Sequence, residues 1–155
     1  MRMALLFFAV LGLAGSLWAA DPLIGTWKLN IEKSKFPPNH PAIPKEQTQT
    51  YRELSNDQIE MTYQNVSMDG SSDLIVSAYP IQGGIGKIQK GDTPFSFVQT
   101  RIAPDEWIVT ALREGKQVWT RQMKISEDGK SMRVTARSFY RDGKPFELLE
   151  VYEKQ

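Results

Sequence analysis

The residues that could do chemistry are few in this sequence, and their spacing matches no catalytic or metal-binding motif. The single histidine, His40, lies in a proline-rich stretch without a serine or cysteine motif, so neither a nucleophilic triad nor a histidine-rich metal site is expected. The segment "GGIGK" at 83–87 lacks phosphate-loop spacing, because Ile81 stands where the first glycine belongs and Ile88 follows the lysine. The segment "DGSSD" at 69–73 offers too few ligands for a calcium loop. The sequence therefore predicts no metal and no cofactor.

Glu150 and Tyr152, near the end of the chain, are the polar pair best suited to a site. One residue separates them in "LLEVYE", so in a β-strand both side chains point to the same face of the sheet. Inside an apolar cavity the carboxylate could orient a ligand, or act as a general acid or base beside the phenol. The role of the pair therefore depends on whether that face is an interior.

The elements that must position this pair are predicted to be β-strands throughout. Ten short β-prone runs alternate with turns such as "MDGSS", "SEDG" and "RDG", whose Gly, Asp and Ser residues are typical of hairpins. No window shows sustained helical periodicity. The proline-rich stretch from Phe36 to Pro44 can form neither a helix nor a central strand, so we expect a loop there. The ten predicted strands cover 23–30, 48–54, 58–66, 72–80, 86–90, 95–102, 106–113, 116–125, 130–140 and 145–153.

Ten antiparallel strands joined mostly by tight turns form a meander, and closure of such a meander into a barrel removes its exposed edges. We therefore predict an all-β fold, a ten-stranded antiparallel up-and-down barrel, with a two-sheet sandwich as the competing architecture. The chain contains no cysteine, which excludes disulfides, a thiolate metal site and a lipid-modified cysteine. Its stability must come from a packed core.

The first 20 residues have the pattern of an export signal. A basic residue, Arg2, precedes an apolar run at 4–18, and small alanines follow at 19–20. The run is shorter than the about 20 apolar residues of a membrane-spanning helix, so cleavage after either alanine is favoured over a retained anchor. We expect a signal peptide at 1–20, a mature domain at 21–155, and a periplasmic or extracellular location without stable membrane insertion.

The charge balance argues against polyanionic partners. The chain has 19 basic and 18 acidic side chains, and removal of residues 1–20 takes away only Arg2, which leaves 18 of each. These charges are scattered and form no patch of one sign. Neither nucleic acid nor an anionic lipid surface is therefore an expected partner.

The two ends of the chain and its "DGK" turns carry a resemblance to known families. "IGTWKLN" near the start, "VYEKQ" at the end and the turns at 128–130 and 142–144 resemble the intracellular fatty-acid-binding proteins and, more loosely, the lipocalins. Both families belong to the calycin group of ligand-binding barrels, and the chain is also similar to exported lipocalin-like domains of bacteria. The resemblance implies that Gly25 lets the first strand bend and that Trp27 packs inward as the floor of the barrel.

The sequence departs from the fatty-acid-binding pattern at two places. That family holds a ligand carboxylate with an Arg-x-Tyr pair on the last strand, and the matching residues here are Glu150 and Tyr152. A glutamate would repel a carboxylate head group, so neutral or cationic amphiphiles are expected instead of fatty acids. The two helices that cover the cavity mouth in that family are replaced by the proline-rich loop 36–44, so ligand access is expected to differ.

The turn lengths decide which side chains face the interior, because side chains alternate along a strand. Three-residue loops at "SEDG" and "RDG" place the Glu150 and Tyr152 pair on an apolar face. Two-residue Asp-Gly turns would instead place that pair beside Arg133 and Arg137 on a charged, solvent-facing side. In the first register, which we prefer, the candidate cavity residues are Trp107, Thr120, Gln122, Tyr140, Glu150 and Tyr152.

Three functions are compatible with such a barrel. The preferred one is an exported, monomeric, non-enzymatic protein that holds a small hydrophobic or amphipathic molecule in its interior. The second is a structural or envelope-associated domain whose interior is filled by its own side chains. The third is a small hydrolase or isomerase that uses Glu150 beside Tyr152. A cavity of a few hundred cubic ångströms would argue against the structural domain with a filled interior. A second titratable group within hydrogen-bond reach of Glu150 would favour the enzyme.

Overall fold

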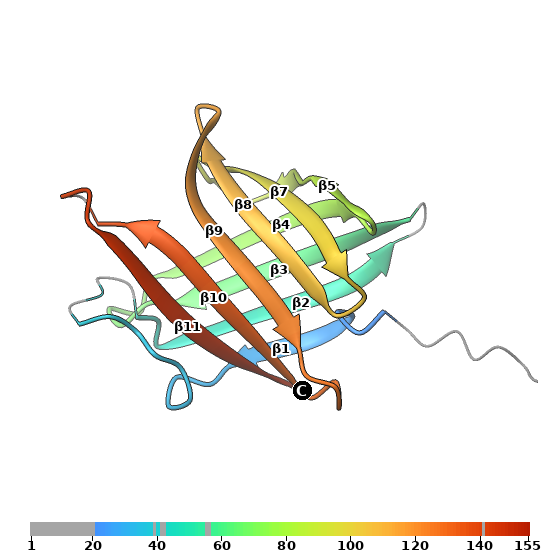
Figure 1. Ribbon diagram of the computed structural model, residues 1–155, viewed down its shortest axis with the longest axis horizontal. Helices are drawn as coiled ribbons and strands as arrows, with labels where there is room; N and C mark the ends of the chain where they lie inside the picture. Colours follow the sequence, from blue (N-terminus) through green and yellow to red (C-terminus); the bar gives the residue numbers. More distant parts are fainter. Residues whose placement is uncertain (1–20, 39, 41–42, 55–56, 141) are drawn as a thin grey trace, which may run out of the picture.

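The elements that the structure contains are all β-strands (Figure 1). The computed structural model describes residues 21–38, 40, 43–54, 57–140 and 142–155, and the predicted signal peptide lies outside them. Among these residues no helix is long and apolar enough to cross a membrane. The strands are β1 (Gly25–Leu29), β2 (Glu46–Leu54), β3 (Gln58–Val66), β4 (Ser72–Pro80), β5 (Gly83–Ile85), β6 (Lys87–Lys90), β7 (Ser96–Ala103), β8 (Glu106–Arg113), β9 (Lys116–Ile125), β10 (Ser131–Phe139) and β11 (Pro145–Lys154).

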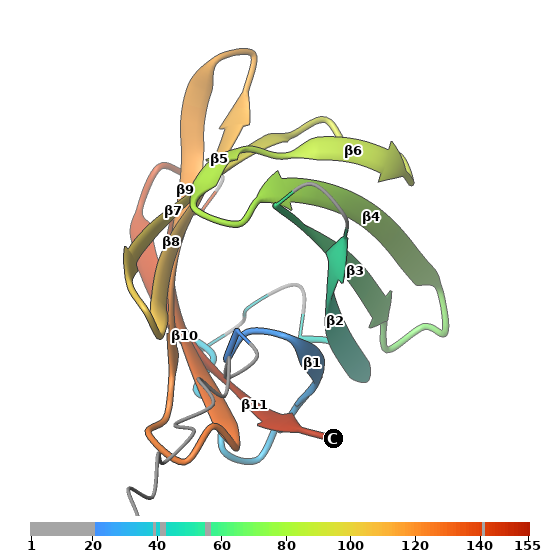
Figure 2. The same cartoon turned by 90° about the vertical axis from the view of Figure 1, so that its right-hand side faces the viewer.

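The strands form one antiparallel sheet that curls into a nearly closed barrel. Along the sheet the order is β5-β7-β8-β9-β10-β11-β1-β2-β3-β4-β6, so most strands pair with their neighbours in the sequence. β1 pairs with both β2 and β11, which joins the two ends of the chain. Figure 2 shows the strands as a ring around a common interior. The predicted all-β antiparallel barrel is therefore confirmed.

The strand count is eleven where the sequence predicts ten, because part of an expected turn forms the short strand β5. β5 pairs with β7, and β6 pairs with β4, so β5 and β6 lie at the two edges of the sheet. In the described part of the chain no backbone ladder joins these edges. Side chains close the gap instead, since Tyr79 of β4 and Phe97 of β7 pack in one apolar cluster with Ala111.

The main core gathers around β1. At its centre are Trp27 and Trp107, both fully buried, together with Leu23 and Tyr152. The indole Nε1 of Trp27 donates a hydrogen bond of 2.9 Å to the carbonyl oxygen of Leu23, so burial leaves its polar atom satisfied. The ring of Trp27 therefore lies inside the barrel, where it supplies a large apolar surface to the core.

A close approach between the first and last strands requires a glycine at Gly25. Its φ of 136° lies in the region that glycine favours, and a Cβ at this position would stand 2.6 Å from Cε of Lys154. Nζ of Lys154 lies 5.0 Å from the ring centre of Trp27 and donates to the carbonyl oxygen of Pro22. Because Gly25 has no Cβ, the side chain of Lys154 on the last strand can pack against the first strand.

Replacement of Trp27 by alanine is expected to lower the free energy of unfolding by about 3 to 5 kcal/mol, because it empties a fully buried aromatic position. Urea unfolding followed by circular dichroism measures the change. The control is Met68→Ala, since this side chain is 75% exposed and its loss should change stability by less than about 0.5 kcal/mol. A Trp27→Ala effect no larger than the control would contradict the buried role.

Candidate functional site

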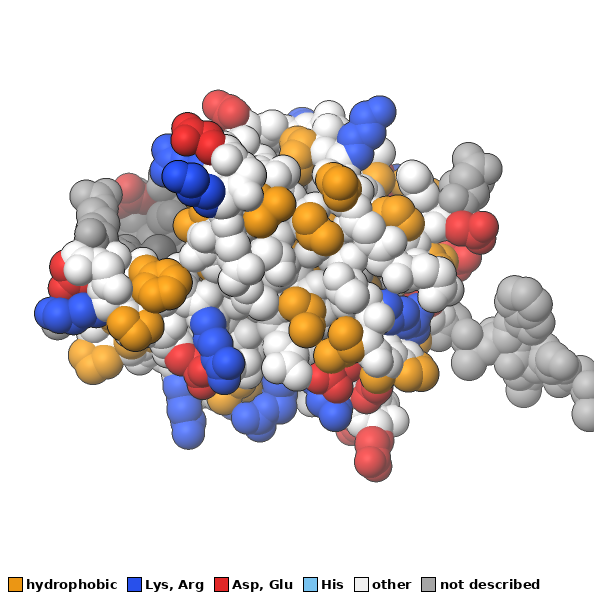
Figure 3. Space-filling view, turned by 45° about the horizontal axis from the view of Figure 1, so that its top comes forward, with side chains coloured by type: hydrophobic (Ala, Val, Ile, Leu, Met, Phe, Trp, Pro, Cys, Tyr) orange, Lys and Arg blue, Asp and Glu red, His pale blue; other side chains and the backbone are white. Residues whose placement is uncertain are grey.

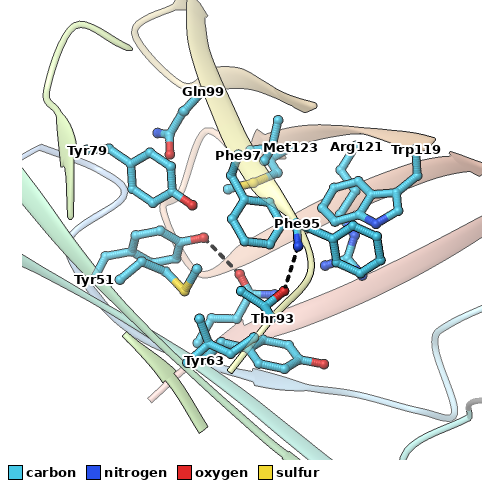
Figure 4. A pocket seen from close by; sticks show the side chains of 14 residues that line it. Tyr51, Tyr63, Tyr79, Thr93, Phe95, Phe97, Gln99, Trp119, Arg121 and Met123 are labelled. Atoms are coloured by element: carbon cyan, nitrogen blue, oxygen red, sulfur yellow. Dashed lines mark hydrogen bonds between the residues drawn. The ribbon is translucent and has the colours of Figure 1, made fainter. Parts of the chain in front are cut away.

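The barrel contains a cavity of about 200 Å³. Its wall is mainly aromatic and aliphatic, and Arg121 is the one charged residue among the described residues that line it. Figure 4 shows the rings of Tyr51, Tyr79, Phe97 and Trp119 gathered around this space. The lining residues are Gln49, Tyr51, Met61, Tyr63, Ile75, Tyr79, Thr93, Phe95, Phe97, Gln99, Val109, Trp119, Arg121 and Met123.

Alternation along β2 and β3 supplies one wall of the cavity. In β2 the side chains of Gln47, Gln49 and Tyr51 are buried, and the threonines between them belong to the other face. Gln49 lies opposite Tyr63, and Tyr51 lies opposite Met61, so these four side chains share one face. The hydroxyl of Tyr51 donates a hydrogen bond of 2.8 Å to Oε1 of Gln49, which fixes both side chains in the wall.

The facing wall is carried largely by β9, whose inward residues include Trp119, Arg121 and Met123. The guanidinium carbon of Arg121 lies 4.8 Å from the ring centre of Trp119, which is a cation–π arrangement. The ring of Trp119 in turn packs on Phe97 of β7, with centroids 5.8 Å apart. The Arg121 side chain is 26% exposed and forms part of the cavity wall.

A network of buried polar groups lies next to Arg121. Its Nη1 is 4.0 Å from Oε2 of Glu150, and the same oxygen accepts a hydrogen bond of 3.1 Å from the hydroxyl of Tyr152. Gln47 donates through Nε2 to the hydroxyl oxygen of Tyr152, and its Oε1 accepts from the hydroxyl of Tyr63 at 3.3 Å. Side chains from β9, β11, β2 and β3 thus hold one buried charge pair in a defined place.

Burial and neighbouring charge shift the ionisation of these groups. Burial is the largest effect on Arg121 and disfavours its charged form, but Glu150 together with the neighbouring tyrosines outweighs it and keeps the arginine pKa raised. Burial, followed by the negative charge of Glu150, raises the pKa of Tyr152 well above its usual value. At neutral pH the site therefore combines protonated phenols with one ion pair. The other tyrosines whose pKa is raised, chiefly by burial, are Tyr51, Tyr63 and Tyr79.

Glu150 and Tyr152 are both buried, at 4% and 0% exposure, but neither belongs to the residues that line the cavity. Tyr152 meets the condition that would favour an enzyme, because its hydroxyl is 3.1 Å from the Glu150 carboxylate. That carboxylate oxygen, however, already accepts from Tyr152 and faces Arg121. In this structure Glu150 is thus paired with Tyr152 and Arg121 outside the cavity wall.

The last hairpin has the length that the sequence predicts, whereas the hairpin before it is one residue longer. The backbone N–H of Tyr140 donates to the carbonyl oxygen of Lys144, which leaves three residues in the "RDG" loop. At "SEDG", Ser126 bonds to Ser131, which leaves four residues in the loop. One extra residue turns every side chain of β9 to the opposite face.

Thr120 and Gln122 therefore lie on the outer face of β9, and their predicted place on the cavity face is wrong. The side-chain amide of Gln122 donates to the carboxylate of Glu106 outside the barrel. Trp107 still points inward, because a β-bulge near Ala111 shifts the register between β8 and β9 by one residue. Trp107 is fully buried in the main core and does not line the cavity.

Tyr140 is also absent from the cavity wall and belongs to an aromatic group where the proline-rich loop meets the last hairpin. Its ring centre lies 4.6 Å from that of Phe146. His40 lies 5.3 Å from Phe146 and 6.0 Å from Phe36 by the same measure. Burial lowers the pKa of His40, and the charge of Glu150 opposes this effect. These contacts attach the loop to the barrel.

Several cavity residues are absent from the set that the sequence predicts, among them Arg121 and Tyr79. The "GGIGK" segment holds one usable signal, because a Cβ at Gly86 would clash with the ring of Tyr79. This glycine therefore makes room for a tyrosine of the cavity wall. Among the described residues, no group of three or more His, Cys, Asp or Glu side chains could hold a metal ion.

The tyrosines provide a test of this electrostatic arrangement at high pH. The pKa values of four buried or largely buried tyrosines, Tyr51, Tyr63, Tyr79 and Tyr152, are higher in the folded than in the unfolded protein. Stability should therefore be constant below about pH 9 and fall as the pH rises above about 10. Tyrosinate absorbance and circular dichroism, recorded together, should change in one cooperative step. Ionisation of all tyrosines near their ordinary pKa, without loss of structure, would contradict the buried network.

Comparisons with known proteins identify the fold. No protein-family model and no curated protein matches the chain. Wild-type fluorescent protein UnaG is 14% identical, with a TM-score of 0.54 over 85% of this chain and 96% of UnaG. A UnaG mutant is 12% identical, with a TM-score of 0.58 over 88% and 99% of the two chains. Zebrafish ileal bile acid-binding protein, complexed with cholic acid, is 10% identical, with a TM-score of 0.52 over 86% and 99%. This chain therefore has the same β-barrel fold as UnaG and the zebrafish bile acid-binding protein, as the sequence predicts.

Proposed function

We propose that this protein is an exported, non-enzymatic binding protein that holds a small, mostly apolar molecule inside its barrel. The observation that carries the proposal is the cavity of about 200 Å³, with apolar walls and a few polar groups. Unfilled space in a core costs stability, so a purely structural barrel would gain by filling it. The cavity therefore favours a ligand-binding role over a domain with a filled interior.

The cavity wall indicates what kind of molecule fits. Its volume is room for on the order of seven water molecules at liquid density, so a compact ligand, or one part of a longer ligand, can occupy it. The rings of Tyr51, Phe97 and Trp119 offer faces for stacking, while Gln49 and Gln99 place amide groups at the wall. These features favour a flat, ring-containing molecule with one or two hydrogen-bonding groups.

The charge of the site favours a neutral ligand. Glu150 already neutralises Arg121, so a ligand carboxylate would compete for the guanidinium and bring a second negative charge beside Glu150. A cationic ligand would meet Arg121 at the cavity wall. Of the neutral and cationic amphiphiles that the sequence suggests, the neutral ones are therefore better supported.

Two further observations support parts of the proposal. The zebrafish protein of the same fold is complexed with cholic acid, so a barrel of this kind accepts a small amphipathic molecule. The basic residue, apolar run and small residues of the first 20 positions support export, and we propose a periplasmic or extracellular location. The charge pairing of Glu150 away from the cavity supports binding over catalysis.

A neutral, environment-sensitive probe such as N-phenylnaphthylamine is expected to bind with enhanced fluorescence. Val109→Trp should weaken this binding by about tenfold or more, because a larger ring would occupy part of the cavity. Ile108→Trp is the control, since the neighbouring residue of β8 faces the other way. No saturable binding by the wild-type protein, or equal binding by all three proteins, would contradict the proposal.

Glu150→Gln tests the charge of the site. Glutamine keeps an acceptor for the Tyr152 hydroxyl but leaves Arg121 without its counter-charge. A naphthalene carboxylate probe should then bind about tenfold more tightly than to the wild-type protein, while a neutral naphthalene probe of the same size changes little. Fluorescence titration of both probes gives the ratio. An unchanged ratio would show that Glu150 does not control ligand charge.

A further inference from the structure

A second hollow, of about 670 Å³, lies in the side of the barrel, and both inward-facing and outward-facing side chains line it. It is formed by residues 117–120 of β9, 137–139 of β10 and 145–147 of β11. Figure 3 shows the molecule hollowed at its left side, next to the hairpin of β10 and β11. Neither the resemblance to fatty-acid-binding proteins nor the proposed function gives this hollow a role.

The hollow exists because β9 and β10 separate from each other. Their ladder ends at the pair Thr120 and Arg137, although β9 begins at Lys116 and β10 continues to Phe139. In Figure 1 the two strands diverge towards their upper ends. Over this stretch of the described chain, a side wall of the barrel is therefore not closed by a β-ladder between β9 and β10.

Trp119 connects the hollow with the cavity, because it lines both. On the inner side its ring packs on Phe97 and carries the guanidinium of Arg121 over its face. On the other side of the hollow, Phe146 packs against Tyr140. The two spaces thus meet at aromatic side chains, which can change rotamer without breaking a backbone ladder.

We propose that the hollow is the outer half of the ligand site: a bound amphiphile keeps its ring in the cavity while its apolar tail leaves the barrel between β9 and β10. The inference rests on the proposed function. It explains how a cavity of about 200 Å³ can serve a ligand that also has a long tail. The contact between the two spaces at Trp119 supplies the route.

The chemistry of the hollow suits an apolar tail. Val118 and Phe146 supply apolar surface, and Phe139 is 64% exposed, so a tail in this place would remove aromatic surface from water. The charged residues of the hollow, Arg137 and Glu147, are paired with each other at 2.7 Å. The hollow therefore presents no unmatched charge to a head group.

The absence of cysteine from the sequence makes a direct test possible, because Ser138→Cys introduces a single thiol into the hollow. The two probes are naphthylamine and its N-octyl derivative, which share the ring and differ in the tail. With each probe at about ten times its Kd, the octyl derivative should slow alkylation of the thiol by iodoacetamide about tenfold. Naphthylamine itself should change the rate by less than about twofold.

Two further variants separate a local effect from a general one. Thr135→Cys places a thiol on the opposite face of the same strand, and neither probe should protect it. Val118→Cys lines the hollow from β9 and should repeat the Ser138→Cys result if that variant folds poorly. In the wild-type protein the octyl tail should also increase affinity about tenfold or more, because its methylene groups leave water.

The outcomes distinguish this inference from the proposed function. If both probes bind but neither protects the thiol of Ser138→Cys or Val118→Cys, the hollow does not hold the tail, and the binding function stands. Equal protection by naphthylamine and its octyl derivative would also overturn the inference, because the tail would then make no difference. If neither probe binds the wild-type protein, the proposed function fails and the inference fails with it.

Discussion

The whole structure depends on the pairing of β1 with β11, because this ladder joins the two ends of the chain and turns a sheet into a barrel. It is short, running from Trp27 opposite Lys154 to Leu29 opposite Tyr152. A bridge between Lys35 and Leu149 adds two backbone hydrogen bonds beside it. The side chains at this seam include two fully buried aromatic residues of the core, Trp27 and Tyr152. At the opposite seam, between β5 and β6, side-chain packing replaces the ladder. An interior exists because backbone pairing closes one seam and aromatic packing closes the other.

The second constraint is the cost of placing a guanidinium inside the barrel. A charge in such surroundings is tolerated when it is paired and its partners are hydrogen-bonded, and Arg121 obtains this from Glu150, which is held by Tyr152. Gln47 extends the network to a third strand, and Tyr63 extends it to a fourth. The ion pair joins β9 and β11 of one meander, whereas Gln47 and Tyr63 come from strands distant in sequence, so the full network forms only when β2 and β3 meet that meander. The same arrangement gives the cavity a charged but neutralised wall, which is the physical basis for preferring neutral ligands.

Much of the fold could be predicted from local features of the sequence. Short turns rich in Gly and Asp separate the strands, and strand alternation requires no knowledge of partners. The length of the "RDG" turn sets the register of the last hairpin, so the sequence also indicated that Glu150 and Tyr152 share a face. The preferred register placed that face in the interior, where the structure has it. The short strand β5 could not, because its glycines are typical of a turn, and its pairing with β7 depends on closure of the barrel.

Which side chains line the cavity depends on the tertiary structure. A four-residue loop in place of three reversed β9, which turned Thr120 and Gln122 outward and brought Arg121 inward. A bulge between β8 and β9 then restored the inward position of Trp107. Neither feature leaves a clear local trace, since one residue in a loop or bulge inverts a whole strand without changing its composition. The sequence by itself determined the barrel class and all strands but β5, and it favoured, without deciding, the register in which Glu150 and Tyr152 are buried. Which of the remaining side chains meet around a common space depends on register across the ladders, and that is settled only when the strands pair.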